Sequence, residues 1–588
     1  MRHILRAAFL TGALLTAAAG LAGANTRPER IVFDGNILFN NSQDGVTPLP
    51  WSANAGPCTT SVAISYSTQD LGTSFFQHNS TTLDPKLVDP FNYASPRWDP
   101  QQLSPANCKY VGDAVVMNVP DPFFEQTDYV GAVPYRSTDP NSDWTTGWTY
   151  YGGPGGNLAG LGRTDINYSK PVVILTDEIF SSMTLLNTNN YLLRGRVGFA
   201  KGTVLTIQPG TYLFGEKATT GYLVIERGAQ INAQGTKAQP IVITSDQVPG
   251  SMAPGDNGGI VIHGQANANC ADFTSASPES CVSEGAAGFF GGLAGAAGFD
   301  DADNSGTCRF MRVEYAGKEI SPDNELNSWT MNALGTGTTM EFLEAFYGVD
   351  DAFEWFGGDN NMKHLVAFGG NDDNFDWQLG FRGKLQFGVC LQLPGRGDKG
   401  IEADNSEFNF TAVPYSNPIM CNLTLIGTNP PTGGLGTTNV GVQFRRGTAG
   451  MVLNSIIYGF RGPGLQLVDP ETFANCPGTS PGVFCQGAIT AVQENETTLS
   501  GKLFTLATPN PASGGMNLMF SLPRDQKNVR AQIFDVSGRL VENLASGPMT
   551  RGAHNIRWAA KHMATGQYFF RVTTESGQAV NTKLVLVH

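Results

Sequence analysis

The feature that most constrains this 588-residue chain is a short internal repeat. Residues 340–355 read MEFLEAFYGVDDAFEW, residues 362–377 read MKHLVAFGGNDDNFDW, and nine of the sixteen aligned positions are identical. A short fixed period that combines strand-type residues with Gly, Asn and Asp is typical of a solenoid. A unit of 22 residues is too short for a pair of helices, but it holds about three short strands with their turns. We therefore predict a right-handed parallel β-helix with 22 residues in each of these coils.

The repeat also predicts which side chains stack. Successive coils lie about 4.8 Å apart, so residues separated by 22 positions should be neighbours. Phe353 is then expected on Phe375, and Trp355 on Trp377. Like charges that stack in this way repel each other unless a cation, an arginine or shared protons compensate. The same shift brings together six carboxylates, which we call the acidic ladder: Asp350, Asp351, Glu354, Asp372, Asp373 and Asp376.

Composition and charge favour an all-β protein and exclude some partners. The chain has 71 Gly and 34 Pro but only 15% charged residues, which is typical of many short strands joined by turns. Its formal net charge of −14 argues against a nucleic acid or an anionic membrane as partner, because either would need a basic face.

Residues 1–24 have the features of a secretory signal peptide. Arg2 and Arg6 form a positive start, an apolar stretch follows, and Ala22-Gly23-Ala24 forms a small-residue cleavage site. We predict that this segment is removed and that the protein is secreted. No other stretch is long and apolar enough to span a bilayer, so no transmembrane anchor is expected.

All nine cysteines follow this segment, in a part of the chain where disulfides can form. No C-x-x-C motif occurs, which argues against a thiolate zinc site or a redox centre. Connectivity does not follow from the sequence alone. Spacing suggests three local pairs, one pair across coils and one unpaired cysteine: Cys58–Cys108, Cys270–Cys281, Cys476–Cys485, Cys390–Cys421 and Cys308.

The remaining chain divides into four parts. Residues 25–170 form a β-rich N-terminal region whose aromatic residues are expected to pack against the first coils. Alternating apolar and polar residues with Gly at the corners place the β-helix at 171–486, with a cysteine-bearing excursion at 264–305. Residues 487–503 are polar and form a linker. Residues 504–588 hold roughly seven short alternating strands and are predicted to form an immunoglobulin-like β-sandwich.

The last module carries several short motifs, among them Pro509-Asn510-Pro511, IFDVSGRLV at 533–541 and Gly566-Gln567-Tyr568. With these motifs it resembles the C-terminal sorting domain of the type IX secretion system, a relative of the immunoglobulin-like domain of flagellar hook-capping proteins. The resemblance implies that the export machinery recognises this module. It also implies passage across the outer membrane of a Gram-negative-type bacterium, followed by release or attachment to the cell surface.

The predicted solenoid contains the phrases LTIQPGT at 205–211, PIVITSD at 240–246, SPDNE at 321–325 and FEWFGG at 353–358. With these it resembles parallel β-helix proteins of bacterial surfaces, a group without a settled activity. This resemblance implies a fold and a location, and it implies no chemistry.

Three interpretations of the acidic ladder stay open. Calcium takes six to eight oxygen ligands, and Asp350, Asp351, Asp372, Asp373 and Asp376 would supply them. A glycosidase-like mechanism needs two carboxyl groups about 5–9.5 Å apart, for which Asp350 and Asp372 are the candidates. The third interpretation is structural, because Asp residues at solenoid corners accept bonds from backbone N–H groups. Further along the chain, an acidic stretch at 402–404 is expected to extend the acidic face by another coil.

Arg382 and Lys384 follow the ladder by one strand. Together with the stacked Asp residues and His364 they resemble the catalytic set of polygalacturonases, which are also parallel β-helices. That resemblance implies catalytic roles for Asp350, Asp372, Arg382 and Lys384, and in a β-elimination lyase Arg382 or Lys384 would be the base beside Ca²⁺. The sequence departs from the pattern, because the Gly-His-Gly turn is missing and His364 lies inside a predicted strand. In the other interpretation both cations neutralise the ladder through salt bridges.

Two classes of function follow. The first is a non-catalytic secreted or surface protein for adhesion, matrix formation or carbohydrate binding, with an extracellular glycan as partner and Ca²⁺ as a stiffening ion. The second is a polysaccharide hydrolase or lyase that uses the acidic ladder. The enzyme predicts an open groove above Asp350 and Asp372, lined by Trp or Tyr, with Arg382 or Lys384 in reach. The incomplete catalytic set favours the binding protein.

Overall fold

The computed structural model describes the following residues: 31–34, 36–39, 85–101, 104, 106, 121–135, 142–152, 158–270, 281–291, 299–321, 324–407, 409–428, 439–475 and, with short gaps, 504–586. The predicted signal peptide, the linker and much of the region 25–170 lie outside these residues. The chain forms two compact units, Met1–Ala491 and Val492–His588. Within the described chain, no helix combines the length and the apolar character that crossing a membrane requires.

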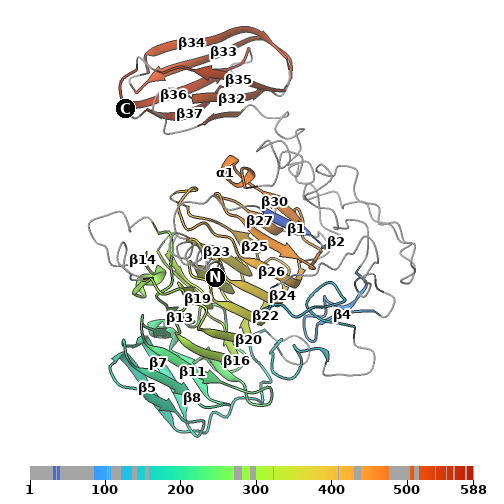
Figure 1. Ribbon diagram of the computed structural model, residues 1–588, viewed down its shortest axis with the longest axis vertical. Coiled ribbons are helices and arrows are strands. Elements are labelled where there is room, and N and C mark those ends of the chain that lie inside the picture. Colours follow the sequence, from blue (N-terminus) through green and yellow to red (C-terminus); the bar gives the residue numbers. More distant parts are fainter. Residues whose placement is uncertain are drawn as a thin grey trace, which may run out of the picture. The chain divides into compact units, whose positions relative to one another are not determined.

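The larger unit is a parallel β-helix, as predicted (Figure 1). Each coil contributes to three stacks of parallel strands, and the long strands of the middle coils bend so that each takes part in two stacks. The first stack contains β6 (Met183–Leu185), β8 (Val204–Ile207), β11 (Gln230–Gln234), the first halves of β16 (Gly306–Glu314), β20 (Thr339–Phe346), β22 (Asn361–Phe368), β24 (Lys384–Leu391) and β26 (Ile419–Ile426), then β28 (Gly450–Leu453) and β1 (Ile31–Asp34).

The other two stacks complete the coil. The second contains the first halves of β5 (Val172–Ile179) and β7 (Asn190–Phe199), β9 (Tyr212–Gly215), β12 (Ile241–Ser245), the second halves of β16 to β26, β29 (Ile456–Tyr458) and β2 (Ile37–Phe39). The third, which bears the acidic ladder, contains the second halves of β5 and β7, then β10 (Tyr222–Ile225), β13 (Ile260–His263), β19 (Trp329–Asn332), β21 (Phe353–Phe356), β23 (Phe375–Gln378), β25 (Lys399–Ala403), β27 (Val440–Phe444) and β30 (Leu465–Leu467).

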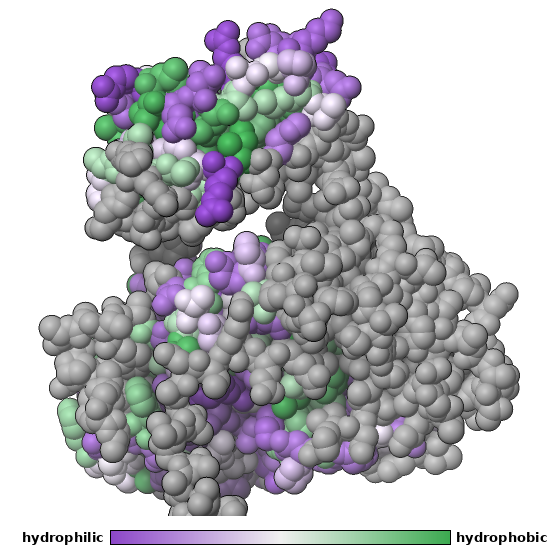
Figure 2. All heavy atoms as spheres, turned by 45° about the horizontal axis from the view of Figure 1, so that its top comes forward, coloured by the Kyte–Doolittle hydropathy of each residue, from purple (hydrophilic) through white to green (hydrophobic). Residues whose placement is uncertain are grey.

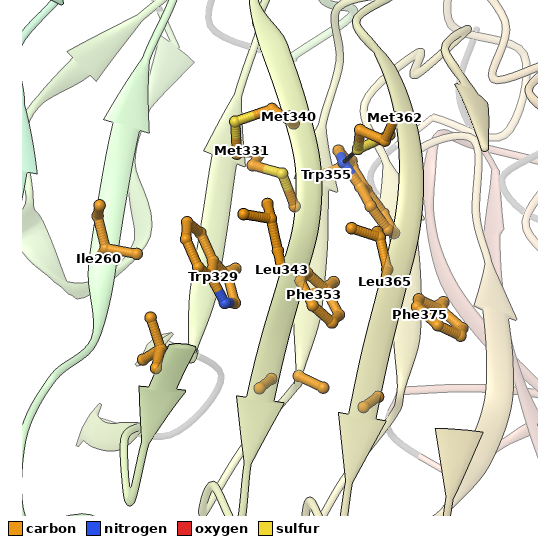
Figure 3. Close-up of a cluster of buried hydrophobic side chains, with 14 of the residues drawn as sticks. Ile260, Trp329, Met331, Met340, Leu343, Phe353, Trp355, Met362, Leu365 and Phe375 are labelled. Carbon is orange, nitrogen blue, oxygen red and sulfur yellow. Dashed lines mark hydrogen bonds between the residues drawn. The ribbon is translucent and has the colours of Figure 1, made fainter. Parts of the chain in front are cut away.

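The interior of the coils is filled by ladders of like side chains (Figure 3). Phe353 pairs in register with Phe375, and Trp355 with Trp377, as the repeat predicts. The rings of Phe353 and Phe375 lie 5.8 Å apart, and Trp329 continues the stack at 6.2 Å from Phe353. Because all five of these aromatic side chains are fully buried, the apolar stack stabilises the middle coils.

A second ladder marks the corner where the long strands bend. Phe310, Phe342, His364 and Phe387 occupy this corner in successive coils, with φ of 46°, 54°, 63° and 65°. Their rings stack at centroid distances of 4.4, 4.2 and 5.1 Å, and Trp144 packs 4.9 Å from the His364 ring. Left-handed backbone is uncommon for such bulky residues, so the stacking holds the corner in place. His364 is therefore one member of an aromatic ladder.

The start of the described chain completes the end of the solenoid. β1 pairs with β28 and β2 with β29, which places the N-terminal strands on the last coil, and Figure 1 shows the blue β1 among orange strands. Between them, the Asn36 side chain donates to the Val452 carbonyl at 2.9 Å and accepts from the Ser455 N–H at 2.8 Å. The sequence pattern had assigned these strands to a separate region, because a contact across more than 400 residues leaves no local signal.

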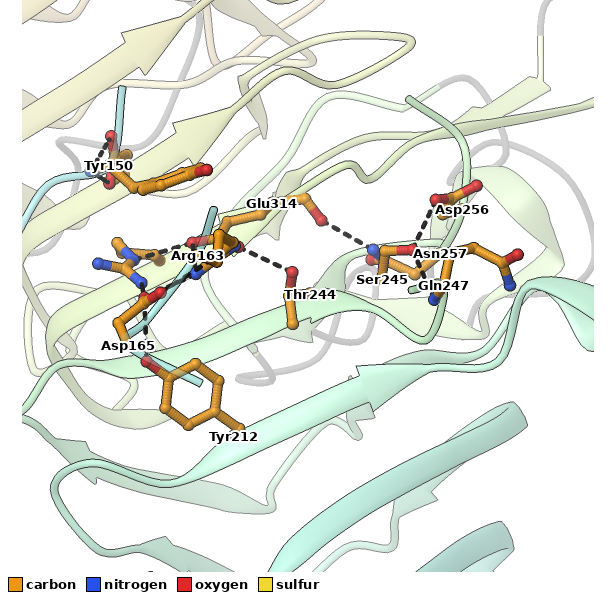
Figure 4. Close-up of polar contacts among 12 residues, drawn as sticks. Tyr150, Arg163, Asp165, Tyr212, Thr244, Ser245, Gln247, Asp256, Asn257 and Glu314 are labelled. Carbon is orange, nitrogen blue, oxygen red and sulfur yellow. Dashed lines mark hydrogen bonds and ion pairs between the residues drawn. The ribbon is translucent and has the colours of Figure 1, made fainter. Parts of the chain in front are cut away.

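The next part of the N-terminal region lies along the second stack and is joined to it by buried ion pairs (Figure 4). Arg163 contacts Glu314 and lies 2.7 Å from Asp165, which in turn lies 2.7 Å from Arg312. Thr244 donates to Glu314 at 2.7 Å. Aromatic residues of the same segment also pack on the solenoid, but Trp148 lies against Phe310 and Phe342 of its middle coils and not against the first coils, as had been expected. We call Arg163, Asp165, Arg312 and Glu314 the ion-pair network.

An excursion leaves the third stack between β13 and β16. It is tied by a disulfide between Cys270 and Cys281, with an S–S distance of 1.99 Å. Cys390 and Cys421 are both free and buried, so the suggested pair across coils is wrong: the strand register sets Cys390 beside Leu425 and not beside Cys421. Cys308 is also free. The other four cysteines lie outside the described residues.

Short elements outside the three stacks are these: β3 (Leu87–Asp89), β4 (Arg97–Pro100), β14 (Cys281–Val282), β15 (Phe289–Phe290), β17 (Lys318–Ser321), β18 (Asn324–Leu326), the 3-10 turns η4 (Lys217–Thr219) and η6 (Glu284–Ala286), and α1 (Pro470–Phe473). The β17–β18 hairpin and η6 each contribute one carboxylate to the cavity described below.

The C-terminal unit consists of two antiparallel sheets, as the predicted sandwich requires. One has the order β31 (Phe504–Thr508), β32 (Met516–Leu522), β35 (Gly552–Trp558), and the other β34 (Leu540–Met549), β33 (Gln526–Asp535), β36 (Gly566–Thr573), β37 (Ala579–Leu586). The unit has its own core, in which Leu518, Trp558 and Phe570 are buried. The face in view in Figure 2 carries hydrophilic and hydrophobic residues side by side, and Val536 is 70% exposed.

Candidate functional site

The acidic ladder lies where the chain turns into the third stack. Asp350 and Asp351 precede β21, and Asp372 and Asp373 precede β23 one coil later. Within the strands, Glu354 pairs in register with Asp376. The predicted stacking of these carboxylates is therefore what the strand register produces.

The row of acids inside the strands is three coils long. Asp376 pairs in register with Glu402 on β25, as expected from the acidic stretch at 402–404. The row ends on both sides in neutral residues, because Thr330 pairs with Glu354 and Gln443 with Glu402. The acidic region is thus confined to the coils that begin at β21, β23 and β25.

Part of the ladder has the structural role that Asp residues take at turns. Asp351 Oδ1 accepts the Asp373 backbone N–H at 2.9 Å, and Asp373 Oδ1 accepts the Lys399 backbone N–H at 2.6 Å. Each bond links one coil to the next. The structural interpretation therefore accounts for one oxygen of Asp351 and one of Asp373, and it leaves the rest of the acidic side chains to be explained.

These side chains surround a cavity of about 240 Å³. At roughly 30 Å³ for each water molecule, it has room for a hydrated ion. Ten of its fourteen lining residues are carboxylic acids: Glu284, Glu325, Asp350, Asp351, Glu354, Asp372, Asp373, Asp376, Glu402 and Glu407, with Asn327, Gln378, Arg445 and Arg446. We call this space the acidic cavity.

Burial makes negative charge costly in the acidic cavity. It raises the pKa of Asp350 to about 8, with the Asp372 charge as the next cause. Burial, followed by the charges of neighbouring carboxylates, raises the pKa values of Asp351 and Asp376 well above the ordinary range. A cation in the cavity would offset this cost, because opposite charge favours the ionised form.

Among the carboxylates that line the cavity, three oxygens are buried without a hydrogen bond, and of these only Glu402 Oε1 faces a cation, Lys399. Asp376 is only 8% exposed, and its Oδ1 has no hydrogen-bond partner; the same holds for Asp350 Oδ2. Both oxygens of the neighbouring Glu354 are satisfied, because Asn327 and Gln378 donate to them. A buried polar atom with no partner costs about 1–3 kcal/mol, so Asp376 Oδ1 is an oxygen of the cavity that the described residues leave without a donor.

The carboxylates are close enough to share ions. Sets of three have ligand oxygens that lie within 4.8 Å of one another. An all-oxygen donor set suits hard cations of the Ca²⁺ class and does not suit the metals that thiolate and imidazole select. Four overlapping sets occur: Asp350/Asp351/Asp372, Asp351/Glu354/Asp376, Asp372/Asp373/Asp398 and Asp373/Asp376/Glu402.

The cations that face these acids differ from those expected. Lys399 Nζ lies 2.6 Å from Glu402 Oε1, contacts Asp398 and lies 4.0 Å from Asp373. Burial acts to lower the pKa of Lys399, but the surrounding carboxylates outweigh it and raise the pKa above its ordinary value. Arg445 contacts Glu402 as well.

Arg382 and Lys384 do not face the acidic ladder, so their predicted role as its neutralising cations is wrong. Arg382 lies 3.3 Å from Asp301, and Lys384 lies 2.6 Å from Asp121. Neither lines the acidic cavity, because Lys384 begins β24 on the first stack, whereas the ladder is on the third. The structure thus brings Asp350 and Asp372 together without Arg382, Lys384 or His364.

Several lining residues went unrecognised in the sequence. Glu284 comes from the excursion and Glu325 from the β17–β18 hairpin, while Glu407, Arg445 and Arg446 follow later strands. Glu325 had a signal, because it ends the SPDNE phrase at 321–325. The others had none, since their place depends on how loops fold back over the third stack.

Comparison with known proteins agrees with the architecture. A family model described as pectate-lyase-like β-helix domain matches residues 177–502, and one described as secretion system C-terminal sorting domain matches residues 507–587. No curated protein matches the chain. Among solved structures, a match is found to chitinase ChiW from Paenibacillus sp. str. FPU-7, described as bacterial cell-surface-expressed multi-modular enzyme machinery. That match has 9% identity and a TM-score of 0.17, covers 70% of this chain and 24% of that protein, and supports no argument about function.

Proposed function

The chain belongs to the pectate-lyase-like β-helix family and ends in a secretion-system C-terminal sorting domain, and on this premise we propose a secreted binding protein that holds a divalent cation of the Ca²⁺ class. The sorting domain implies contact with the type IX export machinery and a place outside the cell or on its surface. The proposal assigns the cation to the acidic cavity of the β-helix.

The observation that carries this proposal is the state of Asp376. Its side chain is buried, its Oδ1 has no partner, and it belongs to two of the three-carboxylate sets. Calcium takes six to eight oxygen ligands at 2.3–2.6 Å. Carboxylates from adjacent coils, with water in the remaining volume, supply this number without a change of fold.

Binding is favoured over catalysis by what surrounds the carboxylates. The described residues that line the acidic cavity include no Trp or Tyr on which a sugar would stack. Arg445 is held by Glu402 and Asp404, so it is not free to act as a base. A β-elimination lyase would need a base other than Arg382 or Lys384, which pair elsewhere.

An extracellular glycan is the partner class that this site would serve. Sugar hydroxyl and carboxylate groups are oxygen ligands of the kind that Ca²⁺ accepts. Arg446 lines the cavity with 30% of its side chain exposed, and it would offer a donor to such a group. In this proposal the cation both stiffens the coils and contributes to the binding face.

Thermal unfolding of the full chain with Ca²⁺ and with excess chelator tests the cation. A ligand present at a hundredfold excess over its Kd stabilises the native state by about 2.7 kcal/mol, so chelation should lower the melting temperature of the β-helix. The transition of the C-terminal unit, which has its own core, should not move and serves as an internal control.

Two variants sharpen this experiment. Asp376→Asn keeps the shape of the side chain and should weaken the response to chelator. Glu341→Gln removes a carboxylate that pairs with Arg309 outside the cavity, and it should respond as the wild type does. Superimposable curves for the wild type with and without chelator would overturn the proposal.

The export part of the proposal has a separate test. A chain that ends before residue 504 retains the β-helix but lacks the sorting domain, and it should accumulate in the periplasm of a bacterium with type IX export. Fractionation of the cells with an antibody to the β-helix measures this. Normal appearance of the shortened chain outside the cell would contradict the assigned role of the module.

A further inference from the structure

Two of the four sets of carboxylates consist of residues that line the acidic cavity inside the third stack, and they are related by one coil. The first set is Asp351, Glu354 and Asp376, and the second is Asp373, Asp376 and Glu402. The strand register carries Glu354 onto Asp376 and Asp376 onto Glu402. We call these sets the first site and the second site. By geometry alone, both would accept a divalent cation.

The two sites differ at the residue that precedes or begins each strand of the third stack. The Asp373 N–H donates to Asp351, and the Lys399 N–H donates in the same way to Asp373. Asp351, Asp373 and Lys399 therefore occupy one position in three successive coils. In the third coil that position carries an ammonium group where the first two coils carry a carboxylate.

The Lys399 ammonium reaches back into the second site. Its Nζ lies 2.6 Å from Glu402 Oε1, 4.0 Å from Asp373 Oδ2, and contacts Asp398. Only 12% of its side chain is exposed. Two carboxylates of the second site thus already face a positive charge. In contrast, within the described parts of the chain, Asp351, Glu354 and Asp376 form no salt bridge.

From this arrangement we propose that Lys399 is the resident cation of the second site, and that of these two sites the β-helix consequently takes up Ca²⁺ at the first. This inference rests on the proposed cation binding and specifies its regulation. Lys399 limits the number of ions, because a divalent cation beside Glu402 would lie against the ammonium group and would be repelled. It also ends the row of ion sites at the third coil.

The test counts the Ca²⁺ ions bound by each full chain. Equilibrium dialysis with metal analysis compares the wild type with Lys399→Met, which keeps much of the side-chain volume and removes the charge. The variant should bind one Ca²⁺ more than the wild type. Lys384→Met removes the same charge from the pair with Asp121, outside the cavity, and should bind as many ions as the wild type.

Two further variants guard against a folding defect. Lys399→Arg keeps a positive charge and should retain the wild-type count. Lys399→Asp extends the row of Asp residues into the third coil, and it should bind one additional ion once refolded in Ca²⁺. Circular dichroism in Ca²⁺ establishes that each chain is folded before its ions are counted.

The outcomes separate this inference from the proposal on which it rests. If the wild type binds Ca²⁺ and neither Lys399→Met nor Lys399→Asp binds more, the role of Lys399 is wrong and the proposed cation binding stands. The role is also wrong if Lys384→Met gains an ion to the same extent. If neither the wild type nor any variant binds Ca²⁺, the proposed function itself fails.

Discussion

Two buried polar regions of the same β-helix solve the problem of buried charge in different ways. In the ion-pair network, two arginines meet two carboxylates, and the side chains of Arg163 and Glu314 are fully buried. In the acidic cavity, ten carboxylates face two arginines among the lining residues, with Lys399 behind them. The first region is complete as a protein structure, whereas the second requires protons or a cation.

The difference follows from what packs on each stack. The second stack is covered by the N-terminal region, which brings Arg163 as a permanent partner for Glu314. The third stack is covered by an excursion and a hairpin that bring further acids, Glu284 and Glu325. A covering segment that supplies opposite charge joins two parts of a fold, whereas one that supplies like charge leaves carboxylates that the proposed ion would neutralise.

The largest expected loss of stability comes from removing one carboxylate of the ion-pair network. Glu314→Gln leaves Arg163 and Arg312 buried with one carboxylate fewer, and removing one member of a buried ion pair costs roughly 3–5 kcal/mol. Urea unfolding of the β-helix measures this loss, which should be the same with and without Ca²⁺. A loss below about 1 kcal/mol would show that the network does not hold the N-terminal region in place.

A smaller change in stability is expected for a variant of the acidic cavity, and its sign should differ between chelator and Ca²⁺. In chelator, Asp376→Asn should be more stable than the wild type, because the change removes a buried negative charge that lies among other carboxylates. In Ca²⁺ the same variant should be less stable, because it loses a ligand. Unfolding curves in the two buffers decide the matter, and a destabilisation of equal size in both would contradict a cation at Asp376.

A contact between uncharged groups at the end of the solenoid can be compared with the two charged regions. Asn36→Ala removes the two hydrogen bonds that join the N-terminal strands to Val452 and Ser455. Hydrogen bonds of this kind contribute about 1 kcal/mol each, so the last coil should open more readily and its amides should exchange faster. Hydrogen exchange of 450–458 measures this, and unchanged protection would show that the N-terminal strands do not close the solenoid.

The smallest expected effect depends on pH. Burial and the neighbouring charges of Lys363 and Arg309 lower the pKa of His364 to about 3, below its ordinary value near 6.5. Because the folded state holds His364 neutral, its contribution is complete above pH 6.5 and is lost as the pH falls toward 3. Between pH 7 and 5.5 this amounts to about 1 kcal/mol.

His364→Phe tests this assignment, because Phe342 and Phe387 already occupy the same corner of neighbouring coils with similar φ. The variant should lose less stability than the wild type on acidification. Identical pH profiles for the two proteins, measured by urea unfolding, would mean that His364 does not titrate with unfolding.

The repeat predicted the coil, the register and the stacking of Phe353 on Phe375, because a constant period leaves its mark on the sequence. It did not predict the partners of the acids. Asp376 and its partner Glu402 are 26 residues apart. A strict period of 22 therefore fails at this coil, and it does not identify Lys399 as the residue that follows Asp351 and Asp373. Arg382 is near the acidic ladder in sequence, but the chain leaves the third stack before it reaches Arg382. The two are therefore not neighbours in the fold.

The most direct test of the central claim is the position of the ion. A crystal of the full chain grown in Ca²⁺, with data collected for anomalous scattering, would locate it without reference to stability or activity. We predict an anomalous peak in the acidic cavity, bound by Asp376 together with Asp351 and Glu354, and none beside Lys399. Ordered electron density for the empty cavity, with no anomalous peak at millimolar Ca²⁺, would contradict the account.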